Sequence, residues 1–363
     1  MTSDKALETA FTRVFDHGPD ASCEVPGRTN LIGEHIDYNG GTVLPAALDR
    51  HVRVALSATD GDTYRIRSAK FDDVVVRNAG TSKQDDWADY AVGALEKARS
   101  LCWLESGADI YIESDVPDGA GASTSAALIT AILNACAVAS KKTADPVAVA
   151  QYARAVENDY IGMPCGIMDQ MAVGLAKPGK ALALNTKDLS YDVIDIPDSW
   201  AFLTIHSGVR RELADGRYKA RFEECQQACE QLGTDTLCLL NEAQLNTVES
   251  LPHSLKKRTR HVVSEHRRTL RAVEAMKTAD RDKFADLMNA SHRSYSEDFE
   301  ASTPEVDTLV SAALEQGALG ARLTGGGFGG CLVILVPADQ QDSWAQSFIA
   351  NNPGTWLVSG PVA

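Results

Sequence analysis

Residues 26–41 read PGRTNLIGEHIDYNGG, and this stretch decides how the rest of the chain is interpreted. It places Arg28, Glu34, His35 and Asp37 within ten positions, between glycines and a proline that turn the chain. An ionised side chain removed from water costs several kcal/mol unless it is paired, so a stretch built only for packing would carry apolar residues at regular spacing. We therefore predict that these side chains bind a polar ligand.

Composition describes a globular protein of two domains. The chain has 363 residues, 44% hydrophobic and 23% charged, which exceeds the ~100–200 residues of a typical domain. The net charge of -15 argues against non-specific binding to nucleic acid, which favours a basic surface. The basic run KKRTR (256–260) opens an amphipathic helical pattern, so we interpret it as a solvated helix face.

The termini and cysteines predict the compartment. The stretch MTSDKALETAFTRVFDHG has no apolar core of a secretory signal, and no run approaches the ~20 apolar residues of a membrane span. Eight cysteines are scattered without the spacing of a disulfide framework, so reduced thiols are expected. We expect a cytoplasmic protein without a membrane or nucleic-acid partner.

The order of elements predicts an α+β fold. Residues 51–58 and 108–114 alternate like strands, whereas 125–140 and 145–159 have helical periodicity. From about residue 210 the pattern is helical, until a strand is predicted at 331–337. A new strand opens near residue 200, so we divide the chain into an N-terminal domain, 1–198, and a C-terminal domain, 199–363.

The stretch VPDGAGASTSAALITAIL (116–133) predicts a loop of small residues before a helix. A helix N-terminus presents unpaired N–H groups and about half a positive charge, and small residues let an anion approach them. The loop lacks the lysine of the Walker pattern, so it is not an ordinary P-loop. The alternative is that Ser123 or Thr124 only caps the helix.

A third element, LTGGGFGGCLVIL (323–335), contains the spacing G-x-G-x-x-G at Gly325, Gly327 and Gly330. A dinucleotide fingerprint follows a strand and opens a helix, whereas these glycines follow a helical stretch and open a strand. We therefore reject a dinucleotide site. The remaining interpretations are a tight turn and a backbone that passes close to a ligand or another loop.

The three elements, in this order, resemble the motifs of the GHMP kinase family, named for galactokinase, homoserine kinase, mevalonate kinase and phosphomevalonate kinase. The first is most similar to the signature of the galactokinases. Similarity continues through VENDYIGMPCGIMDQ (156–170) and SHRSYSEDFEASTPEVDTL (291–309), and so covers most of the chain. The resemblance implies a two-domain α+β fold, with an N-terminal domain like domain 2 of ribosomal protein S5, a ferredoxin-like C-terminal domain and an active site between them.

The resemblance also implies a reaction, ATP-dependent phosphorylation of the anomeric hydroxyl of galactose, with Asp169 and Arg28 as the catalytic pair. It assigns the sugar to Arg28, Asp169, Glu34, His35, Asp37, Gly166 and Tyr218. It assigns ATP to Trp87, Tyr90, Gly119, Gly121, Ser123, Thr124, Ser125 and Ala126. Ser125 and Glu157 match the magnesium ligands, and two hard oxygens together with phosphate oxygens and waters suit Mg²⁺.

Departures from the family pattern leave the identity of the sugar substrate open. Asp118 lies inside the phosphate loop, and Asn185 and His206 stand where galactokinases often carry aspartate and asparagine. A kinase for a related sugar, such as N-acetylgalactosamine or L-arabinose, is therefore the alternative enzyme. A non-catalytic sensor of sugar and ATP is the alternative from another class. The sequence leaves the oligomeric state open.

Overall fold

The structure is a computed structural model that describes residues 3–117, 119–209, 216–240 and 242–360. These residues form two compact units, each assembled from separate segments. Unit 1 comprises residues 1–27, 50–117 and 123–175, and unit 2 comprises 28–49, 118–122 and 176–363. The signature stretch therefore belongs to unit 2, together with the C-terminal half of the chain. The sequential division at residue 198 stays a prediction.

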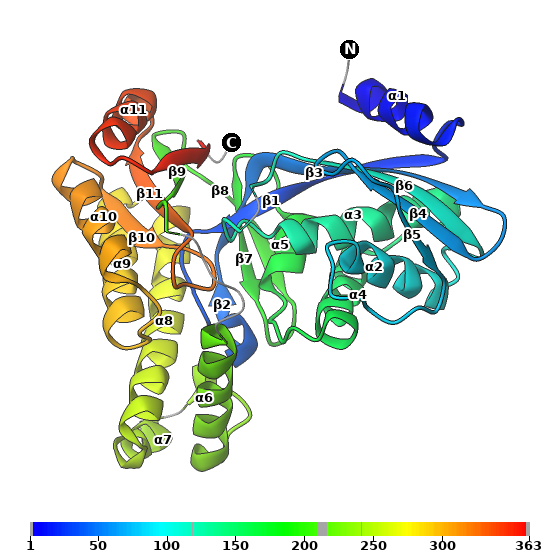
Figure 1. Ribbon diagram of the computed structural model, residues 1–363. Helices are drawn as coiled ribbons and strands as arrows, with labels where there is room; N and C mark the ends of the chain where they lie inside the picture. The colour runs from blue at the N-terminus through cyan, green and yellow to red at the C-terminus, as the bar shows by residue number, and fades with distance from the viewer. Residues whose placement is uncertain (1–2, 118, 210–215, 241, 361–363) are drawn as a thin grey trace. The chain divides into compact units, whose positions relative to one another are not determined.

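Unit 1 is a sheet with helices on both faces (Figure 1). The long strand β3 pairs with β6 in antiparallel register from Val52↔Ser114 to Thr59↔Gly107, β6 pairs with β4 in parallel, and β4 pairs with β5. The strands are β1 (Ala21–Asn30), β3 (Pro45–Thr59), β4 (Thr63–Ser68), β5 (Val75–Asn78) and β6 (Gly107–Ser114). Strands β1 and β3 each begin in one unit and end in the other.

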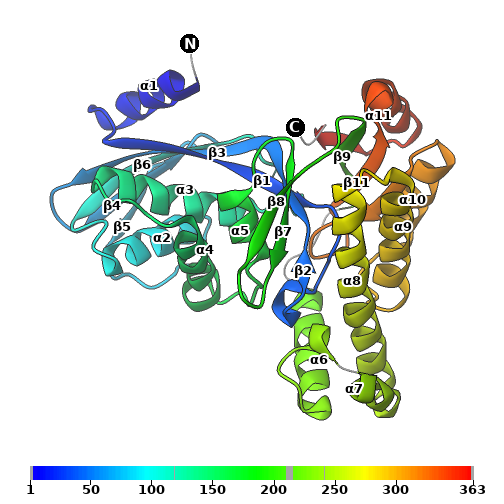
Figure 2. The same cartoon turned by 180° about the vertical axis from the view of Figure 1, so that it is seen from behind.

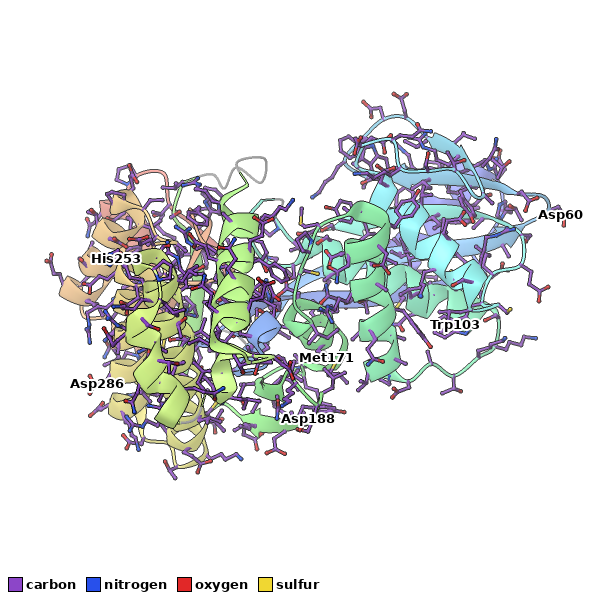
Figure 3. All side chains as sticks on the ribbon, turned by 90° about the horizontal axis from the view of Figure 1, so that it is seen from below. Asp60, Trp103, Met171, Asp188, His253 and Asp286 are labelled. Atoms are coloured by element: carbon purple, nitrogen blue, oxygen red, sulfur yellow. The ribbon has the colours of Figure 1, made fainter. Side chains whose placement is uncertain are left out.

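The helices of unit 1 lie on opposite sides of its sheet. Helix α1 covers one face and the remaining helices lie under the other (Figure 2). Phe11 and Phe15 of α1 pack in one apolar cluster with Ala55 and Tyr111 of the sheet. The helices are α1 (Ser3–Phe15), α2 (Asp89–Ser100), α3 (Thr124–Ala139), α4 (Pro146–Ala155) and α5 (Met168–Leu175). Figure 3 marks Trp103, which follows α2 and contacts the ring of Tyr152 in α4.

The helix predicted over residues 145–159 changes character before its end. Asp145 caps α4 by accepting a hydrogen bond from Ala148 N at 3.0 Å, and Pro146 occupies the first turn, as its fixed φ favours. The α-helix ends at Ala155 and the chain continues as a π-helix, η2 (Val156–Ile161). The helical prediction for residues 145–159 is therefore confirmed, and its last turn, which carries Glu157, is wider than an α-helical turn. Such turns occur often at functional sites.

Unit 2 contains an antiparallel sheet in the order β10-β11-β9-β12. Its strands are β9 (Trp200–His206), β10 (Gly320–Leu323), β11 (Cys331–Pro337) and β12 (Trp356–Ser359). Strands β2 (Thr42–Val43), β7 (Lys180–Asn185) and β8 (Tyr191–Asp195) belong to the sheet that contains β3, which pairs with β7 at Ala46↔Ala181. The strands predicted near residue 200 and at 331–337 are confirmed.

Helices α8 and α9 run side by side in unit 2 and pack on this sheet (Figure 1). Phe202 and Val333 of the sheet share one core with Phe284 and Met288 of α9 and with Leu31 of the signature. A fully buried ring or aliphatic side chain of this kind contributes about 1.5–3 kcal/mol. The helices are α6 (Arg217–Leu232), α7 (Glu242–Thr247), α8 (His253–Lys277), α9 (Arg281–Glu297), α10 (Pro304–Glu315) and α11 (Gln341–Asn351).

Short 3-10 turns complete the description: η1 (Asp37–Asn39), η4 (Leu237–Leu239), η5 (Val248–Ser250) and η6 (Ala338–Gln340). Across the described residues, no helix has the combination of length and apolar character that crossing a membrane requires.

Candidate active site

The signature turn in unit 2 is held in place by contacts at Gly33. This residue has φ +106°, and a Cβ there would lie 3.1 Å from both Thr269 Oγ1 and Val43 Cα, so only glycine fits without strain. Its N–H donates to Glu265 Oε1 at 3.0 Å. Leu31 and Ile32, just before it, are fully buried. The turn is thus fixed in position, and it presents Glu34 and His35.

Glu265 is a buried carboxylate that organises this support. It also accepts from Ser291 Oγ at 2.6 Å and from Arg268 Nε at 2.8 Å. Burial by itself raises the pKa of Glu265, but the attraction of nearby cations outweighs burial and lowers the pKa to about 2. Because burial lowers the pKa of His261 to about 4, that ring is neutral at pH 7, and the attraction then comes from Arg268 and Arg322.

Glu34 is also buried, and donors converge on one of its oxygens. Oε1 accepts from Arg322 Nη1 at 3.1 Å, from Thr324 Oγ1 at 3.1 Å and from Gly325 N at 2.9 Å. The arginine is itself completely buried, so the ion pair has little competition from water. The carboxylate is held in one orientation by the strand β10 and the glycine motif that follows it.

His35 lies in an aromatic cluster. Its Nδ1 is 2.7 Å from Tyr38 Oη and its Nε2 is 3.0 Å from Tyr295 Oη. The rings of Tyr218 and Phe299 pack beside the imidazole, at centroid distances of 5.2 and 4.5 Å. The tyrosine hydroxyls therefore fix the imidazole plane. Tyr218 of α6 lies beside His35, and its contact with the sugar stays a prediction. Asp37, which begins the short helix η1, is half-buried.

Arg28 ties the signature to the loop before α3. Its backbone N donates to Ala122 O at 3.1 Å, and its side chain donates to Gly121 O. The side chain is buried. Two residues of the third motif approach the same loop, since a Cβ on Gly325 would lie 3.3 Å from Gly121 O and a Cβ on Gly330 would lie 3.3 Å from Ala120 O. The glycine motif thus allows close approach to another loop, one of the two interpretations that the sequence left open.

The start of α3 lies in unit 1, and its hydroxyls point at carboxylates. Ser123 takes a left-handed conformation, φ 61° and ψ 40°, which is rare outside glycine and asparagine. Its Oγ donates to Asp169 Oδ2 at 2.6 Å. Within the described chain it makes no side-chain capping bond. The alternative that Ser123 only caps the helix is therefore wrong. Thr124 Oγ1 is 3.5 Å from Pro117 O.

Ser125 and Glu157, the predicted magnesium ligands, are in contact. Ser125 Oγ donates to Glu157 Oε1 at 2.6 Å, and Gln170 donates to the other carboxylate oxygen. Burial raises the pKa of Glu157, and the negative charge of Asp169 raises it further, whereas the hydrogen bond from Ser125 lowers it. A cation beside these two oxygens would favour the charged carboxylate, so the pair fits a hard divalent ion.

The predicted adenine-side residues are in unit 1. Trp87 is half-buried and stacks on Phe71 with ring centroids 4.9 Å apart and an interplanar angle of 23°. Tyr90, on the first turn of α2, is half-buried, and burial raises its pKa. Phe71 is 44% exposed, so the pair offers an aromatic surface to solvent. Sequence reasoning missed Phe71, because a single phenylalanine in a loop carries no pattern.

The remaining predicted residues are small. Gly119 and Gly121 have φ of +70° and +71° in the loop, Ala126 is buried in α3, and Gly166 is buried just before α5. Asp118 lies outside the described residues. Arg28 and Asp169 belong to different units, so their pairing stays a prediction.

Comparison with known proteins identifies related chains. Residues 9–58 match the model of the galactokinase galactose-binding signature, 89–177 that of the GHMP kinase N-terminal domain and 272–352 that of the C-terminal domain. Galactokinases of Exiguobacterium sibiricum and Streptococcus mutans are each 38% identical, over 94% and 92% of this chain and 91% and 89% of theirs.

Solved structures agree with these matches. The crystal structure of Lactococcus lactis galactokinase complexed with galactose superposes with a TM-score of 0.90 at 28% identity, covering 98% of this chain and 97% of that one. Methanococcus jannaschii mevalonate kinase superposes with a TM-score of 0.68 at 18% identity, over 94% and 97% of the two chains. The second likeness concerns the fold alone.

Proposed function

The chain belongs to the galactokinase family within the GHMP kinases and catalyses ATP-dependent phosphorylation of galactose at its anomeric hydroxyl, and we propose that Asp169, Arg28 and the loop before α3 carry out this reaction. The 2.6 Å contact between Ser123 Oγ and Asp169 Oδ2 carries the proposal. It brings the end of the phosphate loop next to the acid that the reaction needs.

Asp169 orients the anomeric hydroxyl and accepts its proton as the oxygen attacks the γ-phosphorus and ADP leaves. Ser123 Oγ donates to Oδ2 of Asp169 and so holds the carboxylate in a fixed position. Phosphoryl transfer asks a protein mainly for positioning and for stabilisation of spread negative charge. Arg28 supplies a positive charge that stabilises the transferring phosphoryl group. The hydrogen bond from its side chain to Gly121 O fixes the position of the phosphate loop relative to the guanidinium group.

Sugar recognition falls to the signature turn. Arg322, Thr324 and Gly325 all donate to Oε1 of Glu34, so we assign Oε2 to a sugar hydroxyl. Asp37 accepts from neighbouring hydroxyls, since a carboxylate can take two donors at once. His35, Gly166 and Tyr218 complete the sugar site. A site that pairs polar groups with particular hydroxyls rejects analogues that lack them, because unmatched groups remain desolvated.

The phosphates of ATP contact the loop and the start of α3, at Gly119, Gly121, Ser123, Thr124, Ser125 and Ala126. Its adenine contacts Trp87 and Tyr90. Ser125 and Glu157 would hold Mg²⁺ through their side-chain oxygens, a donor type that suits this hard ion. When bound, the ion neutralises charge on the phosphates. Gln170 keeps the Glu157 carboxylate oriented toward Ser125. We also propose a cytoplasmic location, where ATP is available and the eight cysteines, which form no disulfide in the structure, stay reduced.

A panel of sugars with ATP and Mg²⁺ tests the proposal. Galactose should give the highest kcat/KM, with N-acetylgalactosamine and L-arabinose well below it. Preference for either of these would instead support the alternative enzyme, which the departures at Asn185 and His206 left open. Absence of turnover with every sugar, despite binding of galactose and ATP, would support the sensor.

A further inference from the structure

A groove on α8 carries an arginine cluster that the sugar kinase reaction does not use. The groove has a volume of about 470 Å³ and is bounded by the turn η5 and the end of α7. Four arginines and one glutamate line it, together with apolar and hydroxyl side chains. Figure 3 marks His253, the first residue of α8, and Asp286 on the neighbouring helix α9. In a chain of net charge -15, this concentration of positive charge is a local exception.

Helical spacing puts the arginines on one face. Arg260, Arg267, Arg268 and Arg271 follow each other at intervals that return to the same side of a helix every three or four residues. Among the described residues, Arg267 and Arg271 have no carboxylate within ion-pair distance, and both are exposed. Their guanidinium groups are therefore available to an anion.

Neighbouring carboxylates neutralise only part of the positive charge of the groove. Glu249, the acidic residue of the lining, is 2.9 Å from Lys256 Nζ, and this bond lowers its pKa. Asp298 is 3.6 Å from Arg260, a long and weak pair. Arg268 donates through Nε to Glu265, while its Nη2 is buried without a hydrogen-bond partner among the described residues. A buried donor left unpaired costs free energy, so Arg268 keeps hydrogen-bonding capacity that its bond to Glu265 does not use.

The walls give the groove the character of a small-molecule site. Leu245, Val248 and Val263 form an apolar side, and Thr259 and Ser264 add hydroxyls. The volume lies within the ~300–1,000 Å³ of ligand pockets. Planar guanidinium groups bind phosphate oxygens through paired hydrogen bonds. The groove is too small and too isolated for the extended contacts of a nucleic acid.

We propose that this groove binds a small phosphorylated molecule, a phosphomonoester with a compact organic body, and that its occupancy is coupled to the sugar-binding turn. Coupling runs through Arg268, because its partner Glu265 also holds Gly33 N of the signature. A phosphate that draws Arg268 toward the groove weakens the support of this turn, so bound ligand raises the KM for galactose. The site goes beyond the sugar kinase reaction, and its binding test needs no turnover.

Isothermal titration calorimetry of the full chain with 3-phosphoglycerate tests the site, with glycerate as the unphosphorylated control. The wild type should bind one equivalent of the phosphorylated compound and not glycerate. The variant Arg267→Gln/Arg271→Gln should lose affinity by about tenfold or more, equivalent to about 1.4 kcal/mol, because charge-assisted bonds to the phosphate are lost. The control Arg13→Gln/Arg293→Gln removes two exposed charges elsewhere and should bind like the wild type.

Equal affinity in the two double variants would overturn the site, as would the absence of binding by both 3-phosphoglycerate and inorganic phosphate. Binding that requires a single-stranded oligonucleotide would also overturn it in favour of a polyanion surface. The coupling is tested by steady-state kinetics. Saturating 3-phosphoglycerate should raise the KM for galactose at least about twofold in the wild type and the control, and leave the groove variant unchanged. An unaltered KM in the wild type would refute the coupling.

Discussion

Replacing Glu265 by glutamine tests how much the buried carboxylate supports the signature turn. Its pKa of about 2 in the folded chain lies below the ordinary value of 4.5, and the residue is fully buried. A shift of this size is equivalent to about 3 kcal/mol of stability at pH 7. Removing one member of a buried ion pair costs a similar amount, about 3–5 kcal/mol. We therefore expect Glu265→Gln to lower the free energy of unfolding by about 3 kcal/mol.

The pH dependence of this loss identifies its cause. A carboxyl group with a lowered pKa contributes stability that is present above its unfolded pKa and disappears as the pH falls through the folded value. The difference between wild type and variant should thus shrink by about 1 kcal/mol from pH 7 to pH 4. Urea denaturation followed by circular dichroism measures both quantities. A loss below about 1 kcal/mol at pH 7, or a loss that is independent of pH, would refute the reasoning.

Three further predictions concern the site. Glu157→Gln should raise the Mg²⁺ concentration that gives half-maximal activity without altering galactose affinity, and an unchanged metal titration would count against its role. Gly325→Ala, at φ +82° and 3.3 Å from Gly121 O, should cost roughly 1–2 kcal/mol and raise the KM for ATP. Tyr38→Phe removes the hydroxyl 2.7 Å from His35 Nδ1, so the KM for galactose should rise about tenfold at nearly constant kcat, and an unaltered KM would contradict this role.

Local patterns made most of the elements predictable. The strand expected at 331–337 has those bounds in the structure, and the helix expected at 125–140 runs from Thr124 to Ala139. Alternating and helical periodicities are properties of short segments, so they survive folding. The π-helix after α4 could not be predicted, because its wider turn depends on what Glu157 contacts in the folded chain.

The residues that hold the site in position could not be predicted from the sequence, for a different reason. Glu265 is 232 residues from Gly33 in the sequence, and Arg322 is 288 residues from Glu34. No local pattern encodes contacts of that separation. Arg322 and Thr324 directly precede the glycine motif, and this adjacency was the one available signal. The motifs themselves identified the family, since their order along the chain is specific even where each motif alone is not.

The measurement that tests the central claim most directly compares turnover and sugar binding in Asp169→Asn. If Asp169 orients and deprotonates the anomeric hydroxyl, kcat should fall by about a hundredfold or more, while calorimetry should find galactose bound within a few-fold of wild-type affinity. Near-normal kcat in this variant would contradict the assignment, and with it the interpretation of the contact between Ser123 and Asp169.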